Sequence, residues 1–315
     1  MGVESVTEFD VVAGDGTSVR AWEHRDDTAE PSTVLWCPGL GATPEAWPDL
    51  LESGAVSHVV SWYHRGTFGS ARPAVPSRIT LAEHVDDALA VLDRAGVARC
   101  TVVGWSVGVG VAAELARRRP DRVSGLLLIA GTPGAGFEAM FGTLGVPAPL
   151  RPLLASTGAM SLRLLGPALD SVLHRMPATE LSARLLQHSG FMRPGADPER
   201  VTAAMRRFLR HDWGWYFTLA LATGLAAAVP LNAVRCPITL VVGRHDLLSD
   251  TPRAVASVAG LAQARVRIFD TSHFVPLEAP AELRDELTLL LRREFAVDCA
   301  RLGLVPEDLP ALETD

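Results

Sequence analysis

Segments with the pattern of buried strands alternate with segments that have a helical pattern along much of this chain, and this alternation constrains the fold more than any other feature. Residues 101–103 and 125–130 are short apolar runs without the polar alternation of a half-exposed strand, which is typical of strands covered on both faces. Residues 107–118, between them, have a helical pattern. Such alternation is characteristic of a parallel sheet, and we therefore predict an α/β fold.

The same patterns predict the rest of the sheet and its flanking helices. Strands are predicted at residues 8–12 and 18–23, which a hairpin turn joins, and at 33–37, 59–63, 238–242 and 265–269, with helices at 80–95, from about 252 and at 280–294. The helix over 80–95 has the clearest start, because Thr80 and Glu83 match a capping box ahead of apolar residues at helical spacing.

The alternation lapses over residues 132–235, which are interrupted by glycines and prolines and lean towards helix. It resumes with the strand at 238–242. We therefore predict one α/β core built from residues 1–131 and 236–298, an inserted helical cap at 132–235, and a C-terminal tail at 299–315.

Composition argues against several classes of function. The net charge of −7, from 29 basic and 36 acidic residues, provides no cationic field for nucleic acid. The most apolar stretches are shorter than a bilayer span, so no membrane span is expected. The four cysteines are far apart and include no C-x-x-C pair, which favours reduced thiols in the cytoplasm and argues against a metal site. Nothing in the sequence indicates the oligomeric state.

The segment Gly104-Trp105-Ser106-Val107-Gly108 has the pattern G-x-S-x-G between a predicted strand and a predicted helix. In a nucleophile elbow, the serine occupies a strained turn at this place, and the flanking glycines let strand and helix approach closely. The alternative is a tight turn in which Ser106 only caps the helix. The glycines at 104, 108 and 110 do not match G-x-G-x-x-G, so we expect no nucleotide cofactor.

A serine hydroxyl needs a base to become a nucleophile, and one of the nine histidines stands in the appropriate place. His273 follows the predicted strand 265–269 on a loop at the edge of the sheet where Ser106 also lies. Six of the other histidines are better explained as surface or core residues, namely His24, His58, His84, His174, His188 and His211.

A carboxylate on the second ring nitrogen would fix the tautomer of His273. Asp246 follows the strand 238–242 and completes the chain order Ser, Asp, His that a nucleophile elbow favours. Asp250 and Asp270 are the alternatives, the first farther into the same loop and the second close to the end of its strand.

These motifs resemble those of the α/β-hydrolase superfamily, in the branch with a helical cap between the sixth and seventh strands. The resemblance covers nearly all of residues 1–298 and rests on the segments 38–41, 65–70, 104–108, 243–246 and 273–274. It implies an eight-stranded, mostly parallel sheet and an oxyanion hole formed by the backbone N–H groups of Leu40 and Val107. Many relatives have His-Gly where this chain has Pro38-Gly39, which removes a supporting side chain from the first donor's loop.

The sequence thus favours a serine hydrolase that cleaves a carboxylic ester or thioester through an acyl-enzyme, with Ser106 as nucleophile, His273 as base and Asp246 as its partner. The cap is rich in Leu, Ala, Met and Phe, and it has aromatic residues at 213–217, so we expect an apolar small-molecule substrate. Other reactions remain open on the same triad, namely lactone, amide or carbon–carbon cleavage, lyase chemistry and perhydrolysis. A slow ligand-binding receptor or an inactive scaffold is the alternative to an enzyme.

Overall fold

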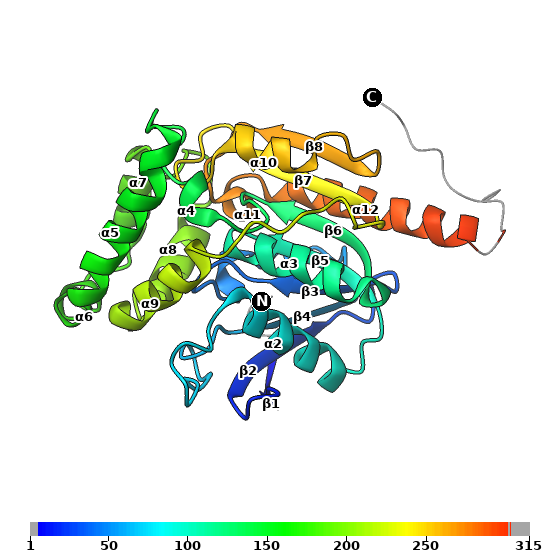
Figure 1. Ribbon diagram of the computed structural model, residues 1–315, viewed down its shortest axis with the longest axis horizontal. Coiled ribbons are helices and arrows are strands. Elements are labelled where there is room, and N and C mark those ends of the chain that lie inside the picture. The colour runs from blue at the N-terminus through cyan, green and yellow to red at the C-terminus, as the bar shows by residue number, and fades with distance from the viewer. Residues whose placement is uncertain (1–5, 302, 304–315) are drawn as a thin grey trace.

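The computed structural model describes residues 6–301 and 303, in which eight strands form one sheet with the order β1-β2-β4-β3-β5-β6-β7-β8 (Figure 1). The strands are β1 (Thr7–Val12), β2 (Ser18–Arg25), β3 (Thr33–Cys37), β4 (His58–Trp62), β5 (Cys100–Trp105), β6 (Val123–Ile129), β7 (Ile238–Gly243) and β8 (Ala264–Phe269). The pairs β1–β2 and β2–β4 are antiparallel, and every other pair is parallel. The predicted α/β fold with a mostly parallel sheet is confirmed.

Helices cover both faces of the sheet. Neighbouring residues of each central strand point to opposite sides, and the apolar side chains on both sides pack against helices. On one face, Val102 and its neighbours pack against α2 (Leu81–Arg94), α3 (Val107–Arg118) and α10 (Thr251–Val258). On the other face, Val103 belongs to a cluster with side chains of α1 (Pro48–Glu52) and α12 (Pro280–Arg301). Burial on both sides explains why these strands have no polar alternation.

Several predicted elements differ from the structure at their ends, and two of them exceed their predicted lengths the most. The strand expected at 101–103 extends from Cys100 to Trp105, and the helix expected to end at 294 continues to Arg301. Residues 299–301, which the predicted tail includes, therefore form the last turn of this helix, while residues 302 and 304–315 of that tail lie outside the described part of the chain. The capping box at Thr80 and Glu83 is present at the start of α2.

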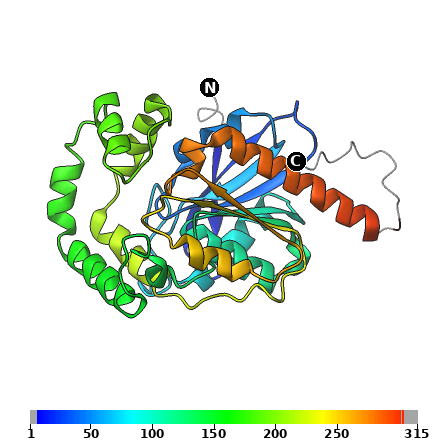
Figure 2. The same cartoon turned by 90° about the horizontal axis from the view of Figure 1, so that it is seen from above.

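Six helices are inserted between β6 and β7. They are α4 (Gly136–Ala139), α5 (Arg151–Leu164), α6 (Gly166–Leu173), α7 (Glu180–His188), α8 (Pro198–Phe208) and α9 (Trp213–Gly224). Figures 1 and 2 show them beyond one edge of the sheet, with α5 and α6 farthest from the strands. The boundaries of a separate cap at residues 132 and 235 stay a prediction.

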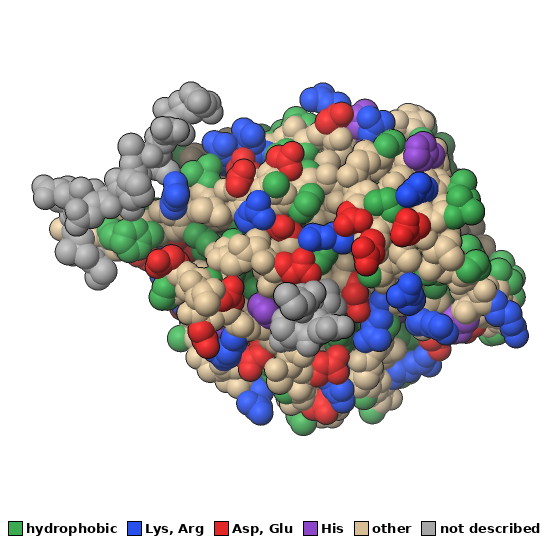
Figure 3. Space-filling view, turned by 180° about the vertical axis from the view of Figure 1, so that it is seen from behind, with side chains coloured by type: hydrophobic (Ala, Val, Ile, Leu, Met, Phe, Trp, Pro, Cys, Tyr) green, Lys and Arg blue, Asp and Glu red, His purple; other side chains and the backbone are tan. Residues whose placement is uncertain are grey.

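Several surface and composition features bear on the possible chemistry. Acidic and basic side chains are mixed over the face seen in Figure 3. Within residues 6–301 and 303, no helix has both the length and the apolar character needed to cross a bilayer. In the same residues, no group of three or more His, Cys, Asp or Glu side chains is arranged to hold a metal ion. All four cysteines are unpaired and buried.

Candidate active site

Ser106 occupies a strained turn between β5 and α3. Its backbone has φ 56° and ψ −118°, a conformation that a side-chain-bearing residue rarely adopts. The glycines on either side make the turn possible, since a Cβ atom at Gly104 would lie 2.5 Å from the carbonyl oxygen of Gly108, and one at Gly108 would lie 2.0 Å from that of Cys37. The local sequence therefore holds the hydroxyl of Ser106 at the carboxyl end of β5.

His273 lies on the loop between β8 and α11 (Val275–Glu278), and its Nε2 is 2.9 Å from Oγ of Ser106. Two contacts fix this loop. The indole Nε1 of Trp105 donates to the carbonyl oxygen of His273 at 3.0 Å, and Glu278 accepts hydrogen bonds from both N and Oγ of Ser272 at 2.6 Å. The imidazole is thus held against the hydroxyl by the backbone on both sides of it.

Asp246 lies on the loop after β7, and its Oδ2 is 2.8 Å from Nδ1 of His273. Its other oxygen, Oδ1, accepts the backbone N–H groups of Leu248 at 2.8 Å and Ser249 at 2.9 Å. The residue is only 1% exposed, so these contacts determine the orientation of its carboxylate. Because the carboxylate only accepts, Nδ1 of His273 carries the proton and neutral Nε2 is left free to accept one from Ser106.

The two alternative aspartates are engaged elsewhere. Asp250 caps α10, where its carboxylate accepts the backbone N–H of Arg253, and it forms an ion pair with Arg151. Asp270 has a side chain that is 70% exposed and is bound to Nε2 of His245 at 2.7 Å. No contact between either carboxylate and His273 occurs among the described residues.

The predicted oxyanion-hole residues, Leu40 and Val107, both line a cavity that also includes Ser106 and His273. Val107 is the first residue of α3, so its N–H has no acceptor within the helix. Leu40 lies in a tight turn in which the N–H of Ala42 donates to the carbonyl oxygen of Gly39 at 2.9 Å. No acceptor for the N–H of Leu40 is found in the described part of the chain.

The cavity has a volume of about 390 Å³ and extends from Ser106 into the inserted helices. Its lining is mostly apolar and includes Phe137, Met140, Ala155, Ala159, Phe208, Trp213, Tyr216 and Phe217. This volume lies towards the lower end of the range for small-molecule sites, about 300–1,000 Å³. The site therefore has room for a modest apolar group next to the hydroxyl of Ser106.

Three residues support this site from other segments and were not predicted from the sequence. Trp105 and Glu278 hold the His273 loop, and the absence of a side chain at Gly131 leaves room for the carbonyl oxygen of Ser106, which would lie 2.4 Å from a Cβ atom there. No local pattern marks Glu278 or Gly131, because their role depends on contacts between distant segments. Of the three, only Trp105 stands within a motif that the sequence shows.

A known protein family matches most of this chain. A model of the "Alpha/beta hydrolase family" matches residues 34–286 of the chain. The chain belongs to the α/β-hydrolase family. Its eight-stranded sheet is the one expected for the fold of that family.

Curated relatives are named as hydrolases. The "Putative carbamate hydrolase RutD" of Rhizobium rhizogenes is 25% identical over 87% of this chain and 98% of its own length. The protein of the same name from Caulobacter vibrioides is 36% identical, but the match covers 32% of this chain and 33% of that protein. The chain thus spans about a third of the length of the first curated relatives that it matches.

Solved structures extend the likeness in fold. The enol-lactonase from Burkholderia xenovorans has a TM-score of 0.66 at 19% identity, with 90% of this chain and 99% of that chain covered. A thermophilic esterase from Thermogutta terrifontis has a TM-score of 0.65 at 19% identity, with 91% and 99% covered. At these identities the likeness shows a shared fold.

Proposed function

We propose that this protein is an enzyme, a serine hydrolase that cleaves a carboxylic ester or thioester of a largely apolar small molecule. The observation that carries the proposal is the chain of hydrogen bonds from Oγ of Ser106 through His273 to the buried carboxylate of Asp246, at 2.9 and 2.8 Å. A hydroxyl, a base and an orienting acid in this order form the arrangement that activates a serine for attack on a carbonyl carbon.

In the acylation step, Oγ of Ser106 bonds to the carbonyl carbon of the substrate while its proton passes to Nε2 of His273. The negative charge that forms on the carbonyl oxygen is stabilised by the N–H groups of Leu40 and Val107, each worth about 3 kcal/mol in such a role. The tetrahedral intermediate then breaks its bond to the alcohol or thiol, which leaves with the proton from His273. Ser106 retains the acyl group.

In the deacylation step, water attacks the acyl carbon and gives a proton to Nε2 of His273. The second tetrahedral intermediate breaks its bond to Oγ of Ser106, which recovers the proton, and the carboxylic acid leaves. Asp246 stays ionised throughout and stabilises the imidazolium that forms in each step. This chemistry requires no metal and no cofactor.

The cavity supports the choice of substrate. Among the described residues, its aromatic and aliphatic lining includes no Asp, Glu, Lys or Arg, so an uncharged acyl or alkyl group would displace water there at little cost. Carbamate hydrolysis is the second candidate, because relatives carry that name and the attack on the carbonyl is the same. The apolar lining favours the ester or thioester.

We further propose a cytoplasmic location, which suits four unpaired cysteines.

The test is covalent labelling with a fluorophosphonate probe, followed by turnover of p-nitrophenyl esters, acyl thioesters and an alkyl carbamate of matched size. We expect labelling at Ser106 and higher kcat/KM for the esters or thioesters than for the carbamate. Absence of labelling of the folded protein would contradict the nucleophile, and a clear preference for the carbamate would replace the substrate while leaving the nucleophile in place.

A further inference from the structure

The turn that holds Leu40 receives a hydrogen bond from a residue of the inserted helical region. Nε2 of His211, which lies between α8 and α9, is 3.0 Å from the carbonyl oxygen of Gly41. A carbonyl oxygen only accepts, so the ring nitrogen is the donor and Nε2 carries a proton. The two residues are 170 positions apart in the sequence.

The turn has a glycine at the point where the imidazole approaches it. Gly41 has φ 69°, in the region that favours glycine, and a Cβ atom there would lie 2.3 Å from Nε2 of His211. The backbone of the turn and the imidazole are therefore in direct contact.

His211 is itself held firmly. It is 3% exposed, and its ring packs against Phe68 with centroids 4.6 Å apart and against Tyr216 at 5.2 Å. Burial lowers the pKa of His211 to about 4, so the ring is neutral at physiological pH and its single N–H faces Gly41. The side chain of His174 also binds the carbonyl oxygen of His211, at 2.9 Å.

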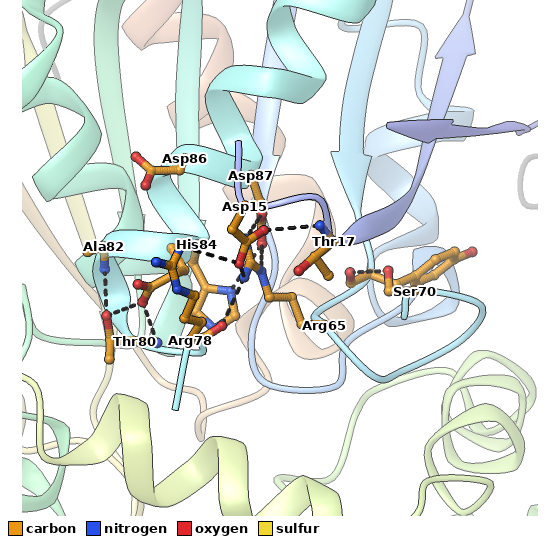
Figure 4. A network of polar contacts seen from close by, with 12 residues as sticks. Asp15, Thr17, Arg65, Ser70, Arg78, Thr80, Ala82, His84, Asp86 and Asp87 are labelled. Carbon is orange, nitrogen blue, oxygen red and sulfur yellow. Dashed lines mark hydrogen bonds and ion pairs between the residues drawn. The ribbon is translucent and has the colours of Figure 1, made fainter. Parts of the chain in front are cut away.

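The segment around His211 is fixed to the core at further points. Nε1 of Trp215 donates to the carbonyl oxygen of Arg65 at 2.7 Å, and Arg72 pairs with Asp212 at 2.5 Å. Arg65 is rigid because its guanidinium is buried between Asp87 and Asp15, at 2.7 Å from each (Figure 4). The position of His211 is thus fixed by contacts that do not involve the turn to which it donates.

We propose that His211 is a positioning residue for the oxyanion hole, which holds the turn at residues 39–42 so that the N–H of Leu40 stays aimed at the developing charge. This inference rests on the proposed function and makes it more specific. In this proposal the inserted region has two roles. It lines the cavity, and through His211 it holds the turn that carries Leu40. His211 is not one of the residues that line the cavity, and its ring packs against Phe208 and Tyr216, which do line it.

The expected effect is on the transition state. The two oxyanion donors act on charge that exists only during the reaction, so a displaced Leu40 lowers kcat and leaves KM nearly unchanged. Complete loss of one donor costs about 10²–10³-fold in kcat. Loosening of the turn costs less than loss, and we expect a decrease of about 10- to 100-fold.

The experiment compares three variants with the wild type on one p-nitrophenyl ester. His211→Ala removes ring and donor, His211→Phe keeps an aromatic ring without a donor, and His211→Gln retains an N–H donor of similar reach. His188→Ala is the matched control, since that exposed histidine of the same inserted region binds only the carbonyl oxygen of Arg184 in the described structure. Steady-state kcat and KM, the rate of fluorophosphonate labelling and the melting temperature are measured for each.

The inference is supported if the Phe variant melts near the wild type and loses kcat at nearly constant KM, with slower labelling, while the Gln variant recovers most of the rate. It is overturned if the Phe variant keeps the wild-type kcat, or if the Gln variant is as slow as the Phe variant. If the wild type neither labels nor hydrolyses any ester, the proposed function fails and this inference fails with it. Wild-type labelling with unaffected His211 variants overturns the positioning role alone.

Discussion

Replacement of Asp246 by Asn tests how the site sets the tautomer of His273. The amide of the asparagine side chain would have one acceptor and one donor group where the carboxylate has two acceptors. Oδ1 of Asp246 accepts the N–H groups of Leu248 and Ser249, so the amide oxygen would take that position. The NH₂ group would then face Nδ1 of His273 across the 2.8 Å that separates this nitrogen from Oδ2 in the wild type.

This orientation inverts the proton arrangement on the imidazole. Nδ1 would have to accept from the amide, so the proton would move to Nε2, which would then donate to Ser106 instead of accepting from it. The hydrogen bond at 2.9 Å would survive with its direction reversed, and the base would be lost without a change in shape. We expect a decrease in kcat of about 10⁴-fold, which is the size of effect measured for this change in an unrelated serine protease.

The assay is hydrolysis of a p-nitrophenyl ester near neutral pH, with circular dichroism and the melting temperature as measures of folding. Asp250→Asn and Asp270→Asn are matched controls, since each removes a charge from the same two loops without a contact to His273. Both controls should keep most of the rate. A folded Asp246→Asn variant that is less impaired than Asp250→Asn would show that the wrong acid has been assigned.

Three further variants test the nucleophile, the cavity and a buried carboxyl group. Ser106→Ala should abolish fluorophosphonate labelling and lower kcat by at least about 10³-fold without unfolding, and equal labelling of the variant would rule out this nucleophile. Ala159→Leu adds three carbons to the apolar lining, so kcat/KM for the longest good acyl chain should fall by about 50-fold, from about 0.8 kcal/mol per methylene, while acetyl esters keep their rate. An equal loss for both esters would contradict this placement of the acyl chain. Burial raises the pKa of Glu294, which accepts a hydrogen bond from Thr101, to about 7. Between the two pKa values the folded state binds a proton that the unfolded state has lost. The free energy of unfolding should therefore decrease by about 2 kcal/mol as pH rises from about 5 to about 7, as urea unfolding would show. Glu294→Gln should remove this decrease, and an unchanged pH dependence in the variant would assign it to another group.

Much of the α/β framework could be predicted because its signals are local. A strand that is covered on both faces must be apolar throughout, which is why a few residues were enough to predict β5 and β6. The capping box of α2 and the turn at Ser106 likewise depend on adjacent residues, since they satisfy backbone groups or avoid clashes within one turn. Three inserted helices also begin at capping residues, Thr179 for α7, Asp197 for α8 and Asp212 for α9, but these local signals do not show how the helices pack. Helix α9 is apolar on nearly all sides because it packs against α4, α5 and α6.

By itself, the sequence determined the α/β fold class, the strained turn at Ser106 and the loops on which Asp246 and His273 lie, because strand order along the chain brings such loops to one edge of a sheet. Only the tertiary structure decided that Asp246 rather than Asp250 or Asp270 reaches Nδ1 of His273, since all three follow strands and differ only in which way their loops turn. It also made His211, one of several histidines without a distinguishing neighbour in the sequence, the partner of Gly41. A hydrogen bond across 170 residues leaves no periodic or local trace, because it depends on how the inserted helices dock and not on the residues next to it.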